Sequence, residues 1–330
     1  MAKYKEIGGT PVAFKSGSEE YTYPSGAEGE LYYNSSNGQF QFVGLGSGVW
    51  SSGGNLNTGR HHMGGSGPQT SSVCFGGIAP ARKDETETYN GTAWTEVGDL
   101  NSGRSMASSG QSQTAALGFA GNVSDPSPKC ALTELWDGSS WTEVGDLNIA
   151  RNNTAGCGTS TAGLCVAGGT PGIIANVENW NGSSWTEIAD INTARANGGT
   201  MGVINTAAVY AGGTKPAQTN DTELWNGTSW TEVNNLNTAR TGIRGFGTST
   251  SGLLAGGEAG TNFSATTEIW DGTSWAEGDD YATAANQRSS GNGSSSVSGL
   301  QAGGAVSGNN ASTATEEWDF SHPIKTVTTS

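Results

Sequence analysis

The chain has 330 residues, of which 14% are charged and 33% hydrophobic, and 53 are glycine, about twice the usual share. The formal net charge of −15 disfavours nucleic-acid binding and attachment to an anionic membrane, because both need a basic surface. Nine prolines and 11 tryptophans exclude a disordered linker and a collagen. Abundant glycine with regularly placed tryptophan favours many short strands joined by tight turns.

The first 44 residues differ from the rest of the chain. Lysines occur near the start without a following apolar segment, so no export signal is expected. Residues 1–29 are interpreted as an arm that docks on a partner, with a frayed tail as the alternative. Residues 30–33 and 39–42 alternate around Asn-Ser-Ser-Asn-Gly, which predicts a β-hairpin. We therefore divide the chain into an arm with a hairpin (1–44), a main domain (45–320) and a tail (321–330).

One segment recurs throughout the main domain, with a glutamate, an aromatic two residues later, a tryptophan five further on and an arginine after ten more. The tryptophans are Trp94, Trp141, Trp185, Trp230 and Trp275, in steps of 47, 44, 45 and 45 residues. Asp-Gly or Asn-Gly between the two aromatics indicates a short hairpin, and a small apolar run ending in Gly-Gly indicates a further strand. About 45 residues with four strands is one blade of a β-propeller.

The two ends of the main domain each hold half a repeat. Trp50 and Arg60 have no glutamate half before them, whereas Glu316 and Trp318 have no second tryptophan after them. Together the halves make a sixth unit. The sequence therefore predicts an all-β, six-bladed propeller closed by an N-terminal strand, in which Trp50 meets Trp318.

Six glutamates and six arginines recur at fixed positions. Because a ligand-binding residue rarely has to repeat in every blade, we interpret them as structural hydrogen-bonded pairs rather than as a ring of binding charge. The set comprises Glu87, Glu134, Glu178, Glu223, Glu268, Glu316, Arg60, Arg104, Arg151, Arg195, Arg240 and Arg288. The last arginine departs from the spacing, since it follows its tryptophan by thirteen residues.

The loop between the second and third strands of each unit varies most in sequence and length. By strand alternation the six loops (78–84, 123–129, 170–176, 214–220, 258–264 and 305–311) share one end of the ring, which we call the variable face. The uniform hairpin loops, which hold the Asp-Gly or Asn-Gly between the two aromatics of each unit, lie at the other end, which we call the hairpin face. Binding residues tend to lie on loops held by a rigid frame, although neutral drift of exposed loops is the alternative. The candidate contact residues are Arg82, Lys83, Lys129, Ile173, Ile174, Lys215, Phe263 and Asn309.

The repeated unit resembles the kelch repeat over about residues 45–320. Its order is Gly-Gly, an aromatic followed by Asp/Asn-Gly, a tryptophan and then Leu-Asn-Thr-Ala-Arg. Two segments, the sequence Gly-Asn-Leu-Asn-Thr-Gly-Arg and residues 24–42, are also similar to kelch-bearing virion proteins of tailed bacteriophages. The resemblance implies a kelch-type propeller that serves as a tail fibre, tail-associated or capsid-decorating component. Such a protein would be made in the host cytoplasm and incorporated into virions. It would contact other virion proteins through the arm and a host glycan or protein receptor through the propeller, as part of a larger assembly without membrane insertion.

Two other functions are alternatives to a virion component. An intracellular kelch-type interaction scaffold has the same frame. A copper oxidase or a carbohydrate-active enzyme would need a Tyr–Cys/His/His set or an arginine triad, and the three histidines and two arginines outside the repeat positions do not form one. We therefore expect no catalytic residues, metal or other cofactor.

The four cysteines match neither a disulfide scaffold nor a zinc site. Cys157 and Cys165 flank a hairpin turn symmetrically, which leaves a disulfide between them open beside the interpretation as small buried thiols.

Overall fold

The computed structural model describes residues 13–15, 31–34, 39–43, 47–123, 128–290, 293, 295–321 and 324–326. The chain forms two compact units: Met1–Gly48 with Phe320–Ser330, and Val49–Asp319. Apart from β1, the arm expected over residues 1–29 lies outside the described residues, as does most of the expected tail.

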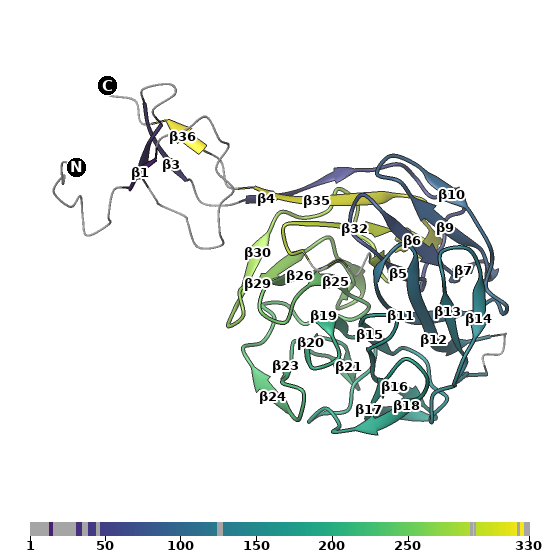
Figure 1. Cartoon of the computed structure of the whole chain (residues 1–330). Helices are drawn as coiled ribbons and strands as arrows, with labels where there is room; N and C mark the ends of the chain where they lie inside the picture. Colours follow the sequence, from purple (N-terminus) through teal and green to yellow (C-terminus); the bar gives the residue numbers. More distant parts are fainter. Residues whose placement is uncertain are drawn as a thin grey trace. The chain divides into compact units, whose positions relative to one another are not determined.

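The larger unit is built from four-stranded antiparallel sheets, which we number as blades along the chain (Figure 1). Blade 1 contains β5 (Gly64–Ser66), β6 (Ser72–Phe75), β9 (Thr86–Tyr89) and β10 (Trp94–Glu96). Blade 2 contains β11 (Ser105–Ser112), β12 (Ala115–Asn122), β13 (Thr133–Trp136) and β14 (Trp141–Glu143). Blade 3 contains β15 (Ala155–Gly158), β16 (Gly163–Thr170), β17 (Gly172–Trp180) and β18 (Trp185–Ile188).

The remaining three blades repeat this order. Blade 4 contains β19 (Gly199–Ile204), β20 (Ala207–Ala211), β23 (Thr222–Trp225) and β24 (Trp230–Val233). Blade 5 contains β25 (Arg244–Gly247), β26 (Gly252–Ala255), β29 (Thr267–Trp270) and β30 (Trp275–Gly278). Blade 6 contains β31 (Ser289–Ser290), β32 (Ser298–Ala302) and β35 (Thr315–Ser321), and its fourth strand is β4 (Ser47–Ser52) from the other end of the chain.

The first strand of each blade is the innermost, and these strands form a closed ring. β5 contacts β11, and the contacts continue through β15, β19, β25 and β31 back to β5. The prediction of an all-β, six-bladed propeller closed by an N-terminal strand is therefore confirmed. Rings of Trp50 and Trp318 lie with their centroids 5.2 Å apart, so the two half-repeats meet in one blade.

Small residues let the six inner strands converge on the axis. A Cβ added at Gly156 would lie 2.3 Å from the Ser108 carbonyl oxygen, and one at Gly65 would lie 2.5 Å from the Ser290 carbonyl oxygen. The Ser108 hydroxyl donates to the Gly65 carbonyl across the gap between two blades, at 2.9 Å. Side chains of ordinary size would push the strands apart, which accounts for the abundance of glycine and serine here.

The hydrophobic core lies between adjacent blades rather than at the axis. Each blade carries an aromatic pair from its third and fourth strands, such as Trp136 with Trp141 at a centroid distance of 5.4 Å. The fourth-strand indole of most blades also donates a hydrogen bond to a threonine in the blade before it, as Trp141 Nε1 does to Thr86 Oγ1 at 2.9 Å. Large aromatic rings thus supply the buried area that a chain poor in leucine otherwise lacks.

The threonine acceptors occupy one repeated position, directly before the repeated glutamate. The indole–threonine bonds join Trp50 to Thr267, Trp94 to Thr315, Trp141 to Thr86, Trp185 to Thr133 and Trp275 to Thr222. In blade 3 the position holds Val177, and Trp230 Nε1 donates to the Ala189 carbonyl instead.

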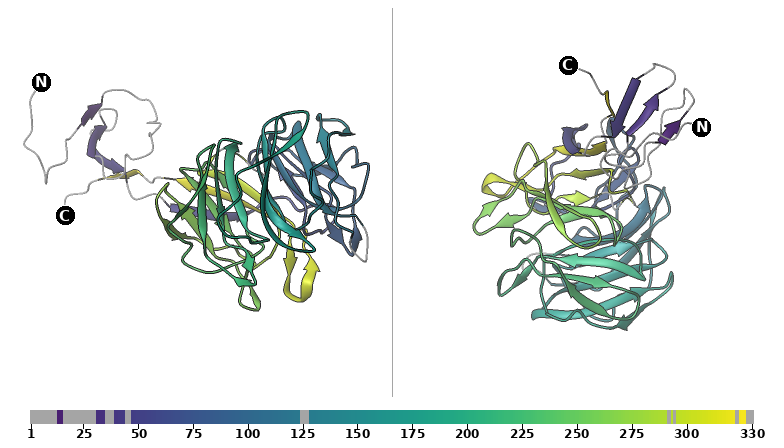
Figure 2. Two further views of the ribbon diagram at one scale, coloured as in Figure 1. Left: turned by 90° about the horizontal axis from the view of Figure 1, so that it is seen from below. Right: turned by 90° about the vertical axis from the view of Figure 1, so that its left-hand side faces the viewer.

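Short hairpins extend four of the loops between second and third strands. They are β7–β8 (Ile78–Ala79, Ala81–Arg82), β21–β22 (Thr214–Lys215, Ala217–Gln218), β27–β28 (Glu258–Ala259, Asn262–Phe263) and β33–β34 (Ala305–Val306, Asn310–Ala311), the last with the 3-10 turn η1 (Ser307–Asn309). In the left view of Figure 2, the light-green β27–β28 hairpin and the yellow β33–β34 hairpin project from the same face of the propeller. No helix among the described residues is long enough and apolar enough to cross a bilayer.

The smaller unit contains one sheet in the order β1 (Ala13–Lys15), β2 (Leu31–Asn34), β3 (Gln39–Val43) and β36 (Ile324–Thr326). β2 and β3 form the predicted antiparallel hairpin, in which Leu31 is opposite Phe42. β36 pairs antiparallel with β3, so part of the segment expected as a tail is a strand.

Removing residues 1–52 deletes β4 and Trp50, whereas removing residues 1–28 leaves both in place. We expect the longer deletion to lower the free energy of unfolding by more than about 3 kcal/mol, since truncating a single core tryptophan costs about 3–5 kcal/mol. The shorter deletion is the control: it removes β1 of the smaller unit but no strand of the propeller, so the free energy of unfolding of the propeller should change by less than about 0.5 kcal/mol. Thermal and denaturant unfolding measure the difference, and equal midpoints for the two deletions would contradict the closure of the ring by β4.

Candidate functional site

The repeated arginines lie in the links that enter each blade, and their guanidinium groups contact the glutamate on the third strand of that blade. Arg60 Nη2 lies 2.7 Å from Glu87 Oε1, and Arg151 Nη2 lies at the same distance from Glu178 Oε1. The side chains of both pairs are at most 2% exposed. The other regular pairs are Arg104–Glu134, Arg195–Glu223 and Arg240–Glu268, equally buried.

An asparagine three residues before each regular arginine completes the site around the carboxylate. The Asn148 backbone N–H donates to Glu178 Oε2 at 2.7 Å, and its side-chain amide donates to the same oxygen at 2.8 Å and to the Trp185 carbonyl at 3.1 Å. The equivalent residues are Asn57, Asn101, Asn192 and Asn237. Our sequence interpretation missed them, although the fixed Asn-x-x-Arg spacing was visible.

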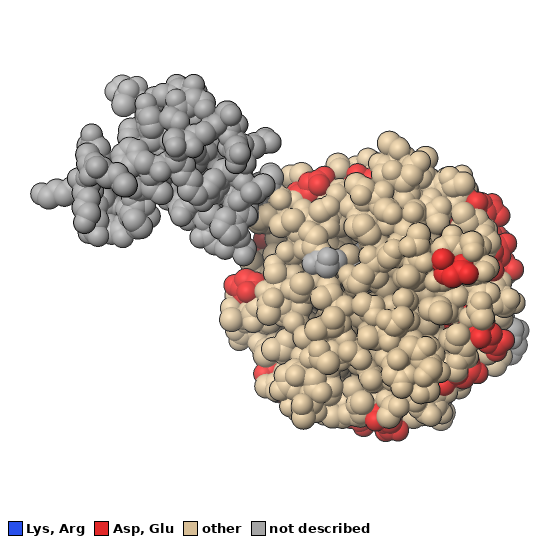
Figure 3. Space-filling model, viewed as in Figure 1, with Lys and Arg blue, Asp and Glu red and all other residues tan. Residues whose placement is uncertain are grey.

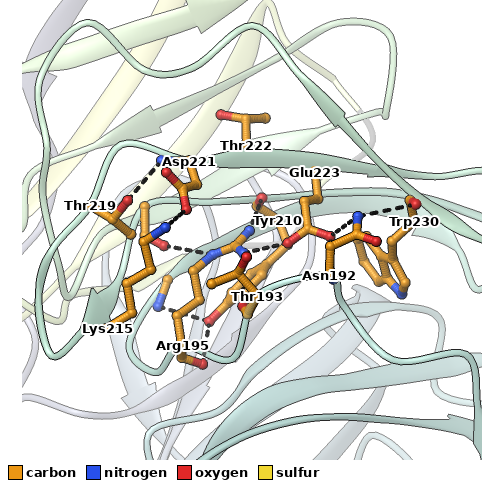
Figure 4. A network of polar contacts seen from close by, with 12 residues as sticks. Asn192, Thr193, Arg195, Tyr210, Lys215, Thr219, Asp221, Thr222, Glu223 and Trp230 are labelled. Atoms are coloured by element: carbon orange, nitrogen blue, oxygen red, sulfur yellow. Dashed lines mark hydrogen bonds and ion pairs between the residues drawn. The ribbon is translucent and has the colours of Figure 1, made fainter.

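The blade 4 site illustrates how fully the guanidinium is used (Figure 4). Besides Glu223, Arg195 donates to the carbonyl oxygens of Gly212, Tyr210 and Thr193, at 3.1, 3.1 and 3.2 Å. Its Cζ atom lies 4.5 Å from the centroid of the Tyr210 ring. Buried charges are tolerated when they are paired and hydrogen-bonded in this way, and nothing remains for a ligand to contact.

Blade 6 departs from this arrangement. The residue after each regular arginine usually forms a β-bridge, as Ala196 does with Thr214, and in blade 6 that residue is Asn286. Ala285 therefore occupies the arginine position, and Arg288 reaches Glu316 from three residues further on, at 3.7 Å. Among the described residues, Arg288 Nη1 has no hydrogen-bond partner, and neither has Arg288 Nε, an atom that is also without a partner in Arg60, Arg104, Arg151 and Arg240. Burial raises the pKa of Glu316 above its usual value, and Arg288 only partly opposes this effect.

The candidate contact residues all lie in the loops of the variable face. Lys83 Nζ is 2.8 Å from Glu85 Oε1, and Lys215 forms an ion pair with Asp221. Lys129 and Arg82 are half-buried, and Arg82 ends β8. Figure 3 views another side of the propeller, on which no Lys or Arg atoms are visible and most acidic atoms lie near the rim.

Blade 3 presents apolar side chains in place of charged ones. Its second and third strands continue as one long hairpin through the loop, with Gly169 opposite Ile173 and Gly168 opposite Ile174. Ile173 is 40% exposed and Ile174 is half-buried.

Phe263 and Asn309, from two neighbouring loops, line one cleft of about 460 Å³. Its walls are the β27–β28 hairpin of blade 5 and η1 of blade 6, and the half-buried Glu258 and the exposed Asn262 contribute polar groups. The volume lies within the range typical of ligand pockets. An aromatic ring beside amide, hydroxyl and carboxylate groups is suited to an uncharged polar ligand.

The cysteines do not form a nucleophilic or disulfide site. All four are free thiols, and Cys157 is opposite Leu164 while Cys165 is opposite Gly156, so the two cysteines are not cross-strand partners. Burial raises the pKa of Cys157 to about 12, which keeps its thiol protonated at neutral pH. Within the described ranges, no three His, Cys, Asp or Glu side chains gather as metal ligands.

Comparison with known proteins supports the fold. No model of a protein family matches the sequence, and no curated protein matches it. Among solved structures, that of YjhT superposes with a TM-score of 0.65 at 12% sequence identity, over 80% of this chain and 96% of the YjhT chain. At this identity the similarity shows a shared propeller fold.

The two kinds of glutamate site should respond differently to Glu→Gln substitution. Glu178→Gln removes a carboxylate that accepts four hydrogen bonds and should cost about 3–5 kcal/mol, because Arg151 is left as an unpaired buried charge. Glu316→Gln should be neutral or stabilising at pH 7, because burial already disfavours its charged form.

The pH dependence provides the check. A raised pKa means that the folded state binds a proton more readily than the unfolded state, so the Glu316 contribution to stability increases as pH falls from above its raised pKa towards 4.5. Thermal unfolding between pH 4 and 7 should show this increase in the wild type and a smaller one in Glu316→Gln. Equal losses of stability for the two variants at pH 7 would refute the distinction.

Proposed function

We infer that the protein is a non-enzymatic propeller of a bacteriophage virion, a tail-fibre, tail-associated or capsid-decorating component that attaches to a host surface or to neighbouring virion proteins. The kelch-type repeat and the similarity of the N-terminal segment to phage virion proteins support this proposal. The observation that carries the binding function is the division of the propeller into a repeated, buried frame and one variable face.

The frame leaves the repeated polar residues no role in recognition. Each regular arginine and glutamate is buried and hydrogen-bonded within its own blade, so the candidate contacts are confined to loops. Rigid frames with variable loops are a common basis of recognition, since the frame lowers the ordering cost of binding. The cleft between Phe263 and Asn309 is the best-formed candidate contact on this face.

A host glycan or a protein receptor fits the chemistry of that cleft. Phe263 offers an apolar face for stacking, whereas Asn262, Asn309 and Glu258 offer hydrogen-bonding groups. The net charge of −15 adds long-range repulsion from anionic surfaces, so short-range contacts would have to supply the affinity.

The virion assignment is tested by mass spectrometry of particles purified from a lysate. Peptides of this chain should copurify with the capsid and tail proteins through a density gradient and remain after a high-salt wash. Recovery only in the soluble fraction would contradict the assignment and favour the intracellular scaffold.

The variable face is tested by binding of purified protein to host cells. Phe263→Ala and Ile173→Ala should weaken binding about tenfold or more if they contact the receptor, since burying such a side chain contributes about 1.5–3 kcal/mol. Ile204→Ala and Val297→Ala are matched controls, because these side chains are 46% and 48% exposed at the hairpin face, where Ile204 ends β19 and Val297 precedes β32. Equal binding by all four variants would refute the assignment of the variable face.

A further inference from the structure

One basic side chain of the propeller belongs neither to the buried arginine–glutamate pairs nor to the variable-face loops. Of its 11 lysines and arginines, six belong to the buried pairs and four (Arg82, Lys83, Lys129 and Lys215) belong to variable-face loops. The eleventh, Arg244, begins the innermost strand of blade 5. It lines two small cavities at the axis, of about 20 and 10 Å³, which puts its side chain at the mouth of the central channel.

Arg244 has no counter-charge in the described part of the chain. Its one hydrogen bond there runs from Nη1 to the Ile243 carbonyl at 3.0 Å, and none of the residues lining the two cavities is acidic. Burial lowers the pKa of Arg244 to about 10, so the guanidinium stays charged at neutral pH. Every other arginine that begins or precedes an inner strand has a glutamate partner, whereas the half-buried Arg244 has none among the described residues, and an unpaired charge that is partly removed from water is unfavourable.

The histidines near the axial mouth neither add to nor compensate the positive charge of Arg244. His61 and His62 lie with their Nδ1 atoms 2.6 Å apart, and burial lowers the pKa of both below 6.5. They are therefore uncharged at neutral pH. Arg244 is the group of fixed positive charge among the residues that line the two cavities.

The backbone holds the mouth in a fixed shape. His62, Asn153, Asn197 and Gln287 adopt left-handed conformations with φ between 54° and 58°, which non-glycine residues rarely adopt. Backbone N–H groups link this ring from blade to blade, as Gly242 does to the Asn197 carbonyl at 2.7 Å and Asn197 to the Asn153 carbonyl at 2.8 Å. Strained conformations of this kind persist where the surrounding structure enforces them, often at binding sites.

We propose that the axial mouth binds one small monovalent anion, of the size of chloride or bromide, against the Arg244 guanidinium. Each cavity has room for an occupant about the size of a water molecule, which favours a small monovalent anion over phosphate, sulfate or a carboxylate-bearing metabolite. Asn153 and Asn197 also line the smaller cavity, and an asparagine side chain carries N–H groups that can donate further hydrogen bonds. The anion neutralises a half-buried charge that otherwise has no partner in the described part of the chain, and it joins residues of blades 3, 4 and 5 at the axis.

Anomalous diffraction at the bromine absorption edge tests this site directly. Crystals of the full chain are grown without chloride and soaked in sodium bromide. We expect an anomalous peak in contact with the Arg244 guanidinium. A peak only at surface positions, or a water at Arg244 in the same map, overturns the proposal, and the wild-type crystal alone is sufficient for this decision.

Thermal unfolding gives a second readout. The melting temperature of the wild type should rise saturably with bromide, beyond the change in Arg244→Gln, because an anion that binds the folded state stabilises it by mass action. Lys129→Gln removes the same charge from a half-buried position in a variable-face loop, away from the two cavities, and should keep the wild-type response. An identical bromide response in the wild type and Arg244→Gln overturns the proposal.

Discussion

The buried ion pair between the arginine of the link and the glutamate of the following blade, regular in five of the six blades, is the interaction on which the rest of the propeller depends. In blade 3, Glu178 accepts hydrogen bonds from Arg151, from both donors of Asn148 and from the Ile149 backbone. A carboxylate and a guanidinium enclosed at this depth are tolerable only when each is paired and hydrogen-bonded. The pair thus fixes the path of the link relative to the third strand, and with it the point at which the chain enters the axis.

Two further features follow from this fixed entry point. The inner strands arrive close enough together that Gly65 and Gly156 have no room for a side chain. The outer strands are correspondingly spread, and the wedge between blades is filled by aromatic pairs such as Trp180 with Trp185, whose centroids lie 5.4 Å apart. A chain with small residues inside and tryptophans outside therefore packs well with few aliphatic side chains, which reconciles its composition with a folded core.

Much of the fold could be predicted from the sequence because a propeller is a local, repeated object. The spacing of the tryptophans defines the blade, and the two half-repeats around Trp50 and Trp318 define both the number of blades and the closure. Hairpin turns were equally predictable, because Asn-Gly and Asp-Gly supply the positive φ that such turns need.

The site residues were harder to predict because they depend on register and on neighbouring blades. Counting residue types placed Arg288 in the sixth arginine position, whereas the strand pairing puts Ala285 there. The cleft of Phe263 and Asn309 forms between the loops of two neighbouring blades, β27–β28 of blade 5 and η1 of blade 6. The sequence of a single repeat does not encode how far two such loops extend relative to each other. Arg244 lies outside every repeated position, and its place beside the axial cavities follows only from how closely the six inner strands converge.

The departures in blade 6 occur where the ring is closed, and the contacts there explain how they are tolerated. Ala282 and Ala285 replace the asparagine and arginine of the regular link, so the link before β31 lacks the usual ion pair. In its place, the Tyr281 ring lies 4.6 Å from the Trp50 ring, and Arg288 Cζ lies 4.6 Å from the Tyr281 centroid.

Trp50 also packs on Trp318 and donates to Thr267 in blade 5, so the closing strand is held by rings on both sides. Aromatic contacts tolerate small changes of angle and distance better than a bidentate carboxylate site does. A seam formed by two ends of the chain is the place where that tolerance matters most, because no continuous link fixes β4 against β35. The ion pairs set the geometry of five blades, and aromatic packing closes the sixth.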